Sequence, residues 1–211
     1  MRRRSNAELS EASREALLAG ARAAFARHGY ANAPLEELVR AAGLTKGALY
    51  HHFGSKQGLF IAVVQAIDAE ILAQVRAEVP ERPATRAGFV HACRLYLEAM
   101  LEPGVRRILL IDCPAVLGYR AMRELEIESS IRPIAEMLDA LVESGEVVAL
   151  DTEATAHLIN GALYDAALWI GDDPRPRQAL DRAVQAFETL LAGLGSQAGR
   201  RRGGATLSSK G

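Results

Sequence analysis

The stretch from Pro34 to Leu59, PLEELVRAAGLTKGALYHHFGSKQGL, constrains the fold of this 211-residue chain more than any other. Apolar residues recur at helical spacing from Leu35 to Ala42, and Gly43 then supplies the left-handed backbone that ends a helix. Thr45 is a suitable N-cap for a second helix that begins directly afterwards. Two short helices joined by so tight a turn predict a helix-turn-helix.

The second of these helices carries residues suited to a DNA surface. Lysine, tyrosine and histidine side chains donate hydrogen bonds to phosphate, and small residues let a backbone approach base edges. Adjacent histidines point about 100° apart on a helix, so contact with phosphate is a simpler use for them than a metal site. The predicted DNA-contacting set is Thr45, Lys46, Gly47, Ala48, Tyr50, His51, His52 and Lys56.

The same residues resemble the DNA-binding signature of TetR-family transcriptional repressors. The resemblance runs from about Leu17 to Phe60 and includes the pairs Gly29-Tyr30, Lys46-Gly47 and His52-Phe53 in register. It implies an all-α fold in which a three-helix DNA-binding domain precedes a helical domain that binds an effector and dimerises. It also implies a homodimer that binds double-stranded operator DNA and is released by a small molecule.

One departure from the family pattern precedes the first helix of the motif. The family commonly has two hydroxyl residues there, whereas this chain has Ala33 and Pro34. Proline suits the first turn of a helix, but neither residue has a hydroxyl to cap the helix or contact a phosphate.

The net charge of −1 conceals an asymmetry along the chain. Residues 1–56 carry a net charge of +4, residues 57–195 carry −9, and residues 196–211 carry +4. A basic N-terminal part suits a surface that neutralises DNA phosphates, and an acidic body repels DNA elsewhere. The arginine runs Arg2–Arg4 and Arg200–Arg202 are additional candidates for loose DNA contact.

The pattern divides the chain into three parts with about nine helices in all. Residues 1–56 form the helix-turn-helix domain with its basic arm, 57–195 form the helical effector-binding and dimerisation domain, and 196–211 form a tail whose glycine, serine and arginine content predicts disorder. A helix from Ser55 to Val79, roughly 35 Å long, should join the first two parts. Pro133 should kink or divide a later helix.

Candidate effector-binding residues come from the helices of the second part. The stripe beginning at Phe89 has helical spacing and is typical of plain core as well as of a pocket. A mostly apolar lining favours an apolar or amphipathic effector. The candidates are Phe89, Cys93, Tyr96, Met100, Cys113, Met122, Asn160 and Tyr164. Asp112 lies in an apolar stretch, where it either faces solvent or recognises a ligand in a cavity.

The last two predicted helices carry a candidate dimer interface. In the final helix, from Pro176 to Leu194, apolar residues alternate at spacings of four and three, a seam that packs a helix against a partner. Spacing alone fits a seam within one subunit equally well. The candidate interface comprises Ala162, Ala166, Trp169, Leu180, Val184, Phe187 and Leu191.

Other functional classes have little support. The chain has no HExxH, GxSxG or P-loop motif, so we predict no enzyme activity, cofactor or metal. Its two cysteines have no paired spacing, and neither a signal peptide nor a membrane span is evident, which predicts a cytoplasmic protein. Two alternatives remain: a helical binding or scaffolding protein whose helix-turn-helix is purely structural, and an enzyme that uses Asp112, Cys113 or His157 in a cavity.

Overall fold

The computed structural model describes residues 6–81 and 84–194, and these residues form helices and connecting turns without a strand. The arginine runs at 2–4 and 200–202 and the tail 196–211 lie outside the described residues. The helical segments are α1 (Asn6–Asn32), α2 (Leu35–Ala41), α3 (Lys46–Phe53), α4 (Lys56–Glu78), α5 (Arg86–Ala99), α6 (Pro103–Arg106), η1 (Arg107–Asp112), α7 (Cys113–Glu126), η2 (Ile127–Ile131), α8 (Arg132–Glu143), α9 (Thr152–Asp172) and α10 (Pro176–Gly193). The expected all-α class is confirmed.

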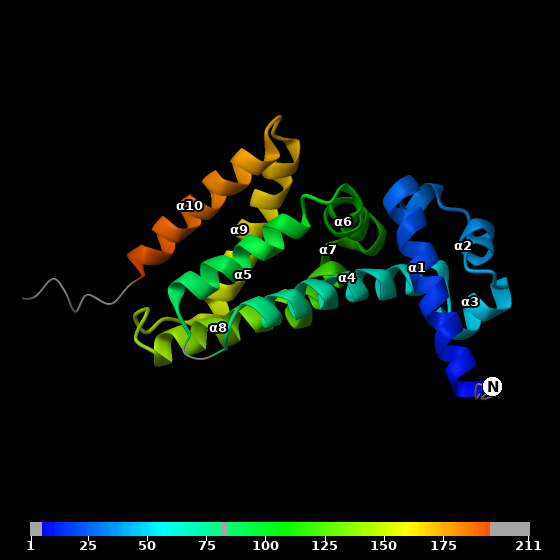
Figure 1. Ribbon diagram of the computed structural model, residues 1–211, viewed down its shortest axis with the longest axis horizontal. Helices are drawn as coiled ribbons and strands as arrows, with labels where there is room; N and C mark the ends of the chain where they lie inside the picture. The colour runs from blue at the N-terminus through cyan, green and yellow to red at the C-terminus, as the bar shows by residue number, and fades with distance from the viewer. Residues whose placement is uncertain (1–5, 82–83, 195–211) are drawn as a thin grey trace, which may run out of the picture.

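Helices α1 to α3 gather at one end of the molecule, and α4 runs from them towards α8 along the side below α5, α9 and α10 (Figure 1). The α4 N-terminus is fixed by Ser55, whose hydroxyl accepts a hydrogen bond from the backbone N–H of Gly58 at 2.9 Å. Leu59, Phe60, Val63, Val64 and Ile67 of α4 are all buried. The helix therefore contributes to one cluster of buried residues that extends from α1 to α10.

α4 is also the one described helix that is long and apolar enough to cross a membrane by length and composition alone. This differs from our expectation that no segment would meet such a test. The reason is that α4 packs against α1, α3, α5 and η2, so apolar residues are needed on several of its faces. Core helices of soluble proteins meet the same test.

The central part of the chain differs from the expected set of separate helices. Segments α6, η1, α7, η2 and α8 follow one another without a loop, and the backbone leaves helical geometry at Gly118, where φ is 77° and ψ is 159°. Pro133 lies near the start of α8, directly after the π-helical η2, so the expected division at this proline takes the form of a change of helix type without a loop. The number of helices thus depends on how this run is divided.

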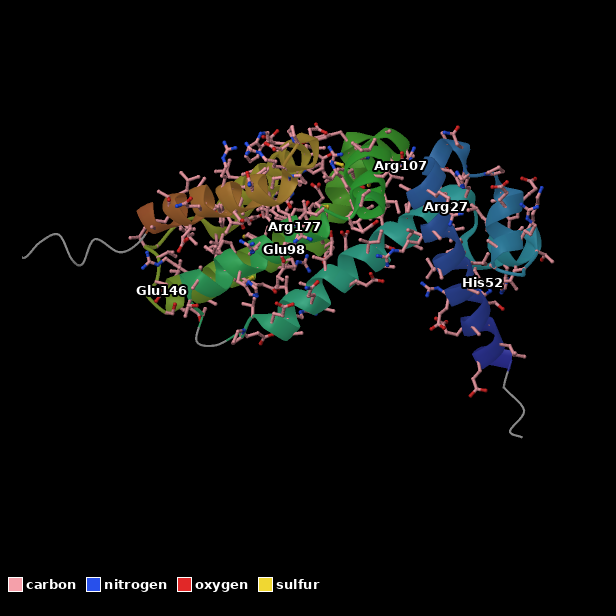
Figure 2. All side chains as sticks on the ribbon, turned by 45° about the horizontal axis from the view of Figure 1, so that its top comes forward. Arg27, His52, Glu98, Arg107, Glu146 and Arg177 are labelled. Carbon is pink, nitrogen blue, oxygen red and sulfur yellow. The ribbon has the colours of Figure 1, made fainter. Side chains whose placement is uncertain are left out.

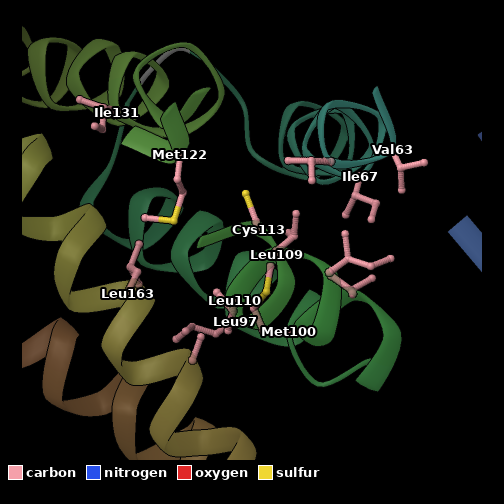
Figure 3. Close-up of a cluster of buried hydrophobic side chains, with 14 of the residues drawn as sticks. Val63, Ile67, Leu97, Met100, Leu109, Leu110, Cys113, Met122, Ile131 and Leu163 are labelled. Atoms are coloured by element: carbon pink, nitrogen blue, oxygen red, sulfur yellow. The ribbon is translucent and has the colours of Figure 1, made fainter. Parts of the chain in front are cut away.

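A buried cluster ties the central run to its neighbours (Figure 3). Leu109, Leu110 and Cys113 lie near Met122 in this view, and Leu163 of α9 approaches from the other side. All five side chains are buried. Residues of η1 are therefore part of the interior of the second domain, although η1 also contacts α1.

Candidate functional sites

α3 presents one face to solvent because its opposite face is anchored in the first domain. Leu49 is fully buried there, together with Leu38 of α2. The predicted N-cap is present, since Thr45 Oγ1 accepts a hydrogen bond from the Ala48 N–H at 3.3 Å. Pro34 precedes α2 without a side-chain cap, as the missing hydroxyl predicted. Tyr50 follows Leu49 and is 52% exposed.

Seven of the eight predicted DNA contacts share this end of the molecule. Thr45, Lys46, Gly47, Tyr50 and His51 are exposed, while Ala48 and His52 are half-buried. The imidazole rings of His51 and His52 lie 5.2 Å apart, and His52 is labelled on this domain in Figure 2. These groups form a polar surface on the outer side of α3 that a phosphate backbone can approach.

Lys46 forms an ion pair with Glu36 of α2. The hydrogen bond between them raises the pKa of Lys46 and lowers the pKa of Glu36. Both side chains are exposed, so the pair contributes little to stability. A phosphate could therefore replace Glu36 as the partner of Lys46 at small cost.

Lys56 departs from the prediction that it contacts phosphate. Its Nζ donates a hydrogen bond to the Tyr30 carbonyl oxygen at 2.5 Å and lies 4.4 Å from the centre of the Tyr30 ring. Burial lowers the pKa of this ammonium group. The carbonyl groups at the end of α1 attract a cation, and this attraction turns Lys56 inward to join α4 to α1.

The end of α1 is held by residues of η1 as well. Arg107 donates hydrogen bonds to the carbonyl oxygens of Arg27 at 3.3 Å and His28 at 3.4 Å, and Figure 2 shows Arg107 beside Arg27. Asp112 Oδ2 accepts a hydrogen bond from the Tyr30 N–H at 2.8 Å. Asp112 is thus neither free in solvent nor a ligand-recognising group, which corrects both of its predicted roles.

This junction requires close approach at two glycines. Gly29 has a φ of 76°, and a Cβ atom there would lie 2.7 Å from an Arg107 nitrogen. A Cβ atom on Gly104 of α6 would lie 2.6 Å from that of Ala26. We call the contacts of Lys56, Arg107 and Asp112 with residues 27–30 the α1 clamp. Sequence reasoning missed it because its partners are up to 82 positions apart.

Two adjoining cavities lie in the second domain. The first, of about 80 Å³, is mostly apolar and is bounded by α4, α5, η2, α8 and α9. The second, of about 40 Å³, lies deeper and is bounded in part by Leu109 and Leu110 of η1. Seven of the eight predicted effector-binding residues line one or both cavities: Phe89, Cys93, Tyr96, Cys113, Met122, Asn160 and Tyr164.

Met100 is the exception among these predictions. It is the C-cap of α5 and only 1% exposed, and it does not line either cavity. The α5 stripe faces the cavities at Phe89, Cys93 and Tyr96, but Met100 follows at the point where the chain turns towards α6. Its position in the stripe could not distinguish core from cavity.

Two carboxyl groups in the cavity wall were not predicted. Asp68 of α4 lines both cavities, and burial raises its pKa to about 6. Glu126 of α7 lines the deeper cavity and forms an ion pair with Arg123 at 2.5 Å. In the sequence, Asp68 stands out only as a charged residue between Ile67 and Ile71 of an apolar helix. That position does not indicate whether its side chain faces a cavity.

The predicted dimer interface is divided by the structure. Leu180 and Leu191 are buried, and Phe187 packs against Phe89 with 6.0 Å between ring centres. The seam of α10, including the half-buried Val184, therefore packs against α5 of the same subunit, the alternative that its spacing had left open.

The α9 residues of the predicted interface are more exposed than those of α10. Ala162 and Trp169 are exposed, Ala166 is half-buried, and Leu158, one turn before Ala162, is 76% exposed. On α10, Leu190 is 73% exposed, and the Arg182 guanidinium stacks 5.2 Å from the Trp169 ring centre. We call Leu158, Ala162, Trp169, Arg182 and Leu190 the α9/α10 face.

The chain is similar to proteins of one regulatory family along most of its length. Residues 17–63 match bacterial regulatory proteins of the tetR family, and residues 86–194 match the tetracyclin repressor-like C-terminal domain. A crystal structure of a TetR-family transcriptional regulator from Pectobacterium atrosepticum is 41% identical and has a TM-score of 0.73, with 92% of this chain and 99% of that chain covered.

Relatives known by name match the chain over different lengths. The HTH-type transcriptional repressor AcnR of Corynebacterium glutamicum is 46% identical over 66 residues, which cover 31% of this chain and 35% of that protein. The Transposon Tn10 TetC protein of Escherichia coli is 23% identical over 157 residues, covering 73% of this chain and 78% of that protein. The chain thus spans about a third of the length of the AcnR repressors it matches.

Proposed function

We propose that this chain, which belongs to the TetR family of DNA-binding transcriptional regulators, is a repressor that binds a palindromic operator as a homodimer and is released by a small apolar or amphipathic effector. The family consists of transcription factors and not of enzymes. We place the protein in the cytoplasm, where its operator would be.

The exposed face of α3 carries this proposal. Tyr50 is held outward by the buried Leu49 beside it, and Gly47 leaves the start of the helix open. The Lys46 ammonium lies on the same surface in an ion pair that phosphate can replace. A protruding helix with these groups fits the major groove with its N-terminal residues against base edges.

Gly47→Leu is expected to lower operator affinity by about a hundredfold, since a bulky side chain would separate α3 from the groove. The fold should tolerate it, because a Cβ atom on Gly47 meets only Thr45 Oγ1, at 3.6 Å. Tyr50→Phe should lower affinity by about fivefold through loss of one hydrogen bond. Affinity would be measured by fluorescence anisotropy on an operator selected from random DNA by the wild-type protein.

Tyr119→Phe is the matched control for Tyr50→Phe, because Tyr119 is 74% exposed on α7, in the second domain. It should leave operator affinity unchanged. If Gly47→Leu and Tyr50→Phe also bind as wild type, α3 is not the DNA-binding helix.

Effector control is proposed to act through the cavities, because their walls belong to the elements that hold α1. Val64 and Asp68 come from α4, whose first residue is Lys56, and Leu109 and Leu110 come from η1. A ligand that moves either wall would shift the α1 clamp, and with it the α3 surfaces of a dimer. Operator release then depends on the difference in the ligand's affinity for the two states.

Cys93→Trp is expected to mimic an effector and to weaken operator binding by about tenfold, a coupling typical of allosteric proteins. Cys93 is 5% exposed and lines the cavity of about 80 Å³, which an indole ring would overfill. Cys93→Ser, which preserves the side-chain size, should bind operator as wild type does. Circular dichroism and sedimentation would verify that Cys93→Trp retains its helices and its dimer. Unchanged operator affinity in a folded Cys93→Trp protein would argue against control through this cavity.

A further inference from the structure

The two cavities adjoin a groove, and the three together form a continuous path whose lining changes in chemistry from one end to the other. The groove, of about 270 Å³, lies among the end of α4, the start of α5 and α8, and shares Leu72, Val75, Phe89, Pro133 and Met137 with the first cavity. It carries both charge signs, with Arg76, Glu81 and Glu136. Its entrance therefore does not select for ligand charge.

The middle of the path is apolar. Ile71, Val75 and Phe89 line it, with Met137 and Leu163 opposite. Burial raises the pKa of the Cys93 thiol to about 12, so this thiol remains neutral. This section suits an aliphatic segment, because burying carbon surface there stabilises the complex and burying unpaired polar groups would not.

The inner end is polar but carries no basic side chain among the described residues: acceptors of Asp68, Glu126 and Asn160 lie there with the hydroxyl groups of Tyr96, Ser129 and Ser130. Asn160 is 6% exposed, and its Nδ2 donates to Glu126 Oε2 at 3.3 Å. That bond fixes the orientation of the amide, so Asn160 Oδ1 is left as an acceptor without a hydrogen-bond donor in the described part of the chain. The Tyr164 hydroxyl is already used, since it donates to the Leu110 carbonyl oxygen at 2.9 Å.

Asp68 adds a carboxylate to this inner end. Glu126 is paired with Arg123, but among residues 6–81 and 84–194 no basic side chain forms an ion pair with Asp68, which interacts with Ser129. Asp68 is half-buried, and a carboxylate withdrawn from water without a cation beside it is stabilised by a ligand that supplies one.

We infer that the path binds an aliphatic primary amine, with its ammonium group between Asp68 and Asn160 and its carbon chain directed towards Phe89 and Met137. An ammonium group supplies hydrogen-bond donors and the positive charge that the described residues lining this end do not provide. The deeper cavity, of about 40 Å³, accommodates only a small head group. This inference rests on the proposed function in one respect: it assigns a chemical class to the effector of the same site.

The test compares three probes with the same eight-carbon chain: n-octylamine, octan-1-ol and sodium octanoate. Their affinities for the full chain, without DNA, would be measured by isothermal titration calorimetry at neutral pH. Octylamine should bind at least about tenfold more tightly than octanol, a difference of about 1.4 kcal/mol, and octanoate should bind most weakly. Equal or tighter binding of octanol or octanoate would overturn the inference, as would absence of binding by all three.

Asp68→Asn should remove the preference for octylamine while retaining octanol binding, and it should not lower the melting temperature, because it removes an unpaired buried charge. Asp139→Asn, the same change at an exposed position of α8 away from the cavities, should retain the preference. A preference that survives Asp68→Asn would place the amine elsewhere and overturn the assignment. The comparison of probes on the wild-type protein remains decisive if Asp68→Asn does not fold.

Operator release is measured in a separate experiment. Its outcome distinguishes a failure of the proposed effector control from a failure of the proposed ligand class. Octylamine that binds as expected but leaves the operator complex intact would count against effector control and in favour of the assigned ligand class. Operator binding that is normal while octylamine shows no preference would overturn the ligand class alone.

Discussion

Replacing both Leu158 and Leu190 by glutamate is expected to convert the proposed dimer to folded monomers and to abolish measurable operator binding. Each substitution occurs twice in a symmetric dimer, so four carboxylates would be placed against apolar surface. At about 1 kcal/mol or more for each, the dimer dissociation constant should rise by about a thousandfold. A monomer would contact only one operator half-site.

The choice of these two leucines follows from their exposure. They are 76% and 73% exposed on neighbouring helices, and the stacking of Arg182 on Trp169 joins the two helices on that side. The change should therefore leave each subunit intact. Pairing this α9/α10 face with a second copy would form a four-helix bundle, an arrangement in which helices bury such apolar surface.

Sedimentation velocity and circular dichroism would measure dimerisation and helix content together. Ile127→Glu, which charges an apolar residue that is 42% exposed on η2, is the matched control and should remain dimeric. Phe187→Glu, by contrast, should destabilise the subunit, because that ring packs against Phe89. A Leu158→Glu/Leu190→Glu protein that remains dimeric would place the interface elsewhere.

The helix-turn-helix could be predicted from sequence because its determinants are local. Thr45 caps α3 through an N–H three residues ahead, and Ser55 does the same for α4. The break at Gly29 is equally local, since only its own backbone has to adopt a positive φ. Each of these signals lies within one helical turn of the feature that it specifies. It can therefore be recognised in the sequence without knowledge of the tertiary structure.

The remaining features depend on which distant segments meet. The spacing of Leu180, Phe187 and Leu191 fits a seam within a subunit and one between subunits equally well, and α5 turned out to be the partner. Asp112 appeared to be an isolated charge because its partner, the Tyr30 N–H, is a backbone group in another domain. No side-chain pattern marks a backbone partner that lies far away in the sequence.

Breaking the α1 clamp at Asp112 is expected to uncouple the cavity from DNA binding. Asp112→Ala leaves the Tyr30 N–H without its carboxylate and should cost about 1–3 kcal/mol of unfolding free energy. Its more informative effect concerns Cys93→Trp. If the cavity acts through η1, Cys93→Trp should lower operator affinity by about tenfold in the wild-type background but by about twofold in the Asp112→Ala background.

The measurement is a double-mutant cycle of operator affinities. Asp172→Ala provides the matched control, because Asp172 Oδ1 accepts a hydrogen bond from Arg106 Nη2 at 2.7 Å, beside η1 but away from α1. The changes in operator-binding free energy caused by Asp172→Ala and by Cys93→Trp should be additive. Additive effects for Asp112→Ala as well would mean that the Asp112 contact does not transmit the signal. The other contacts of the α1 clamp would then have to carry it, namely those of Arg107 with Arg27 and His28 and the hydrogen bond of Lys56 to the Tyr30 carbonyl oxygen.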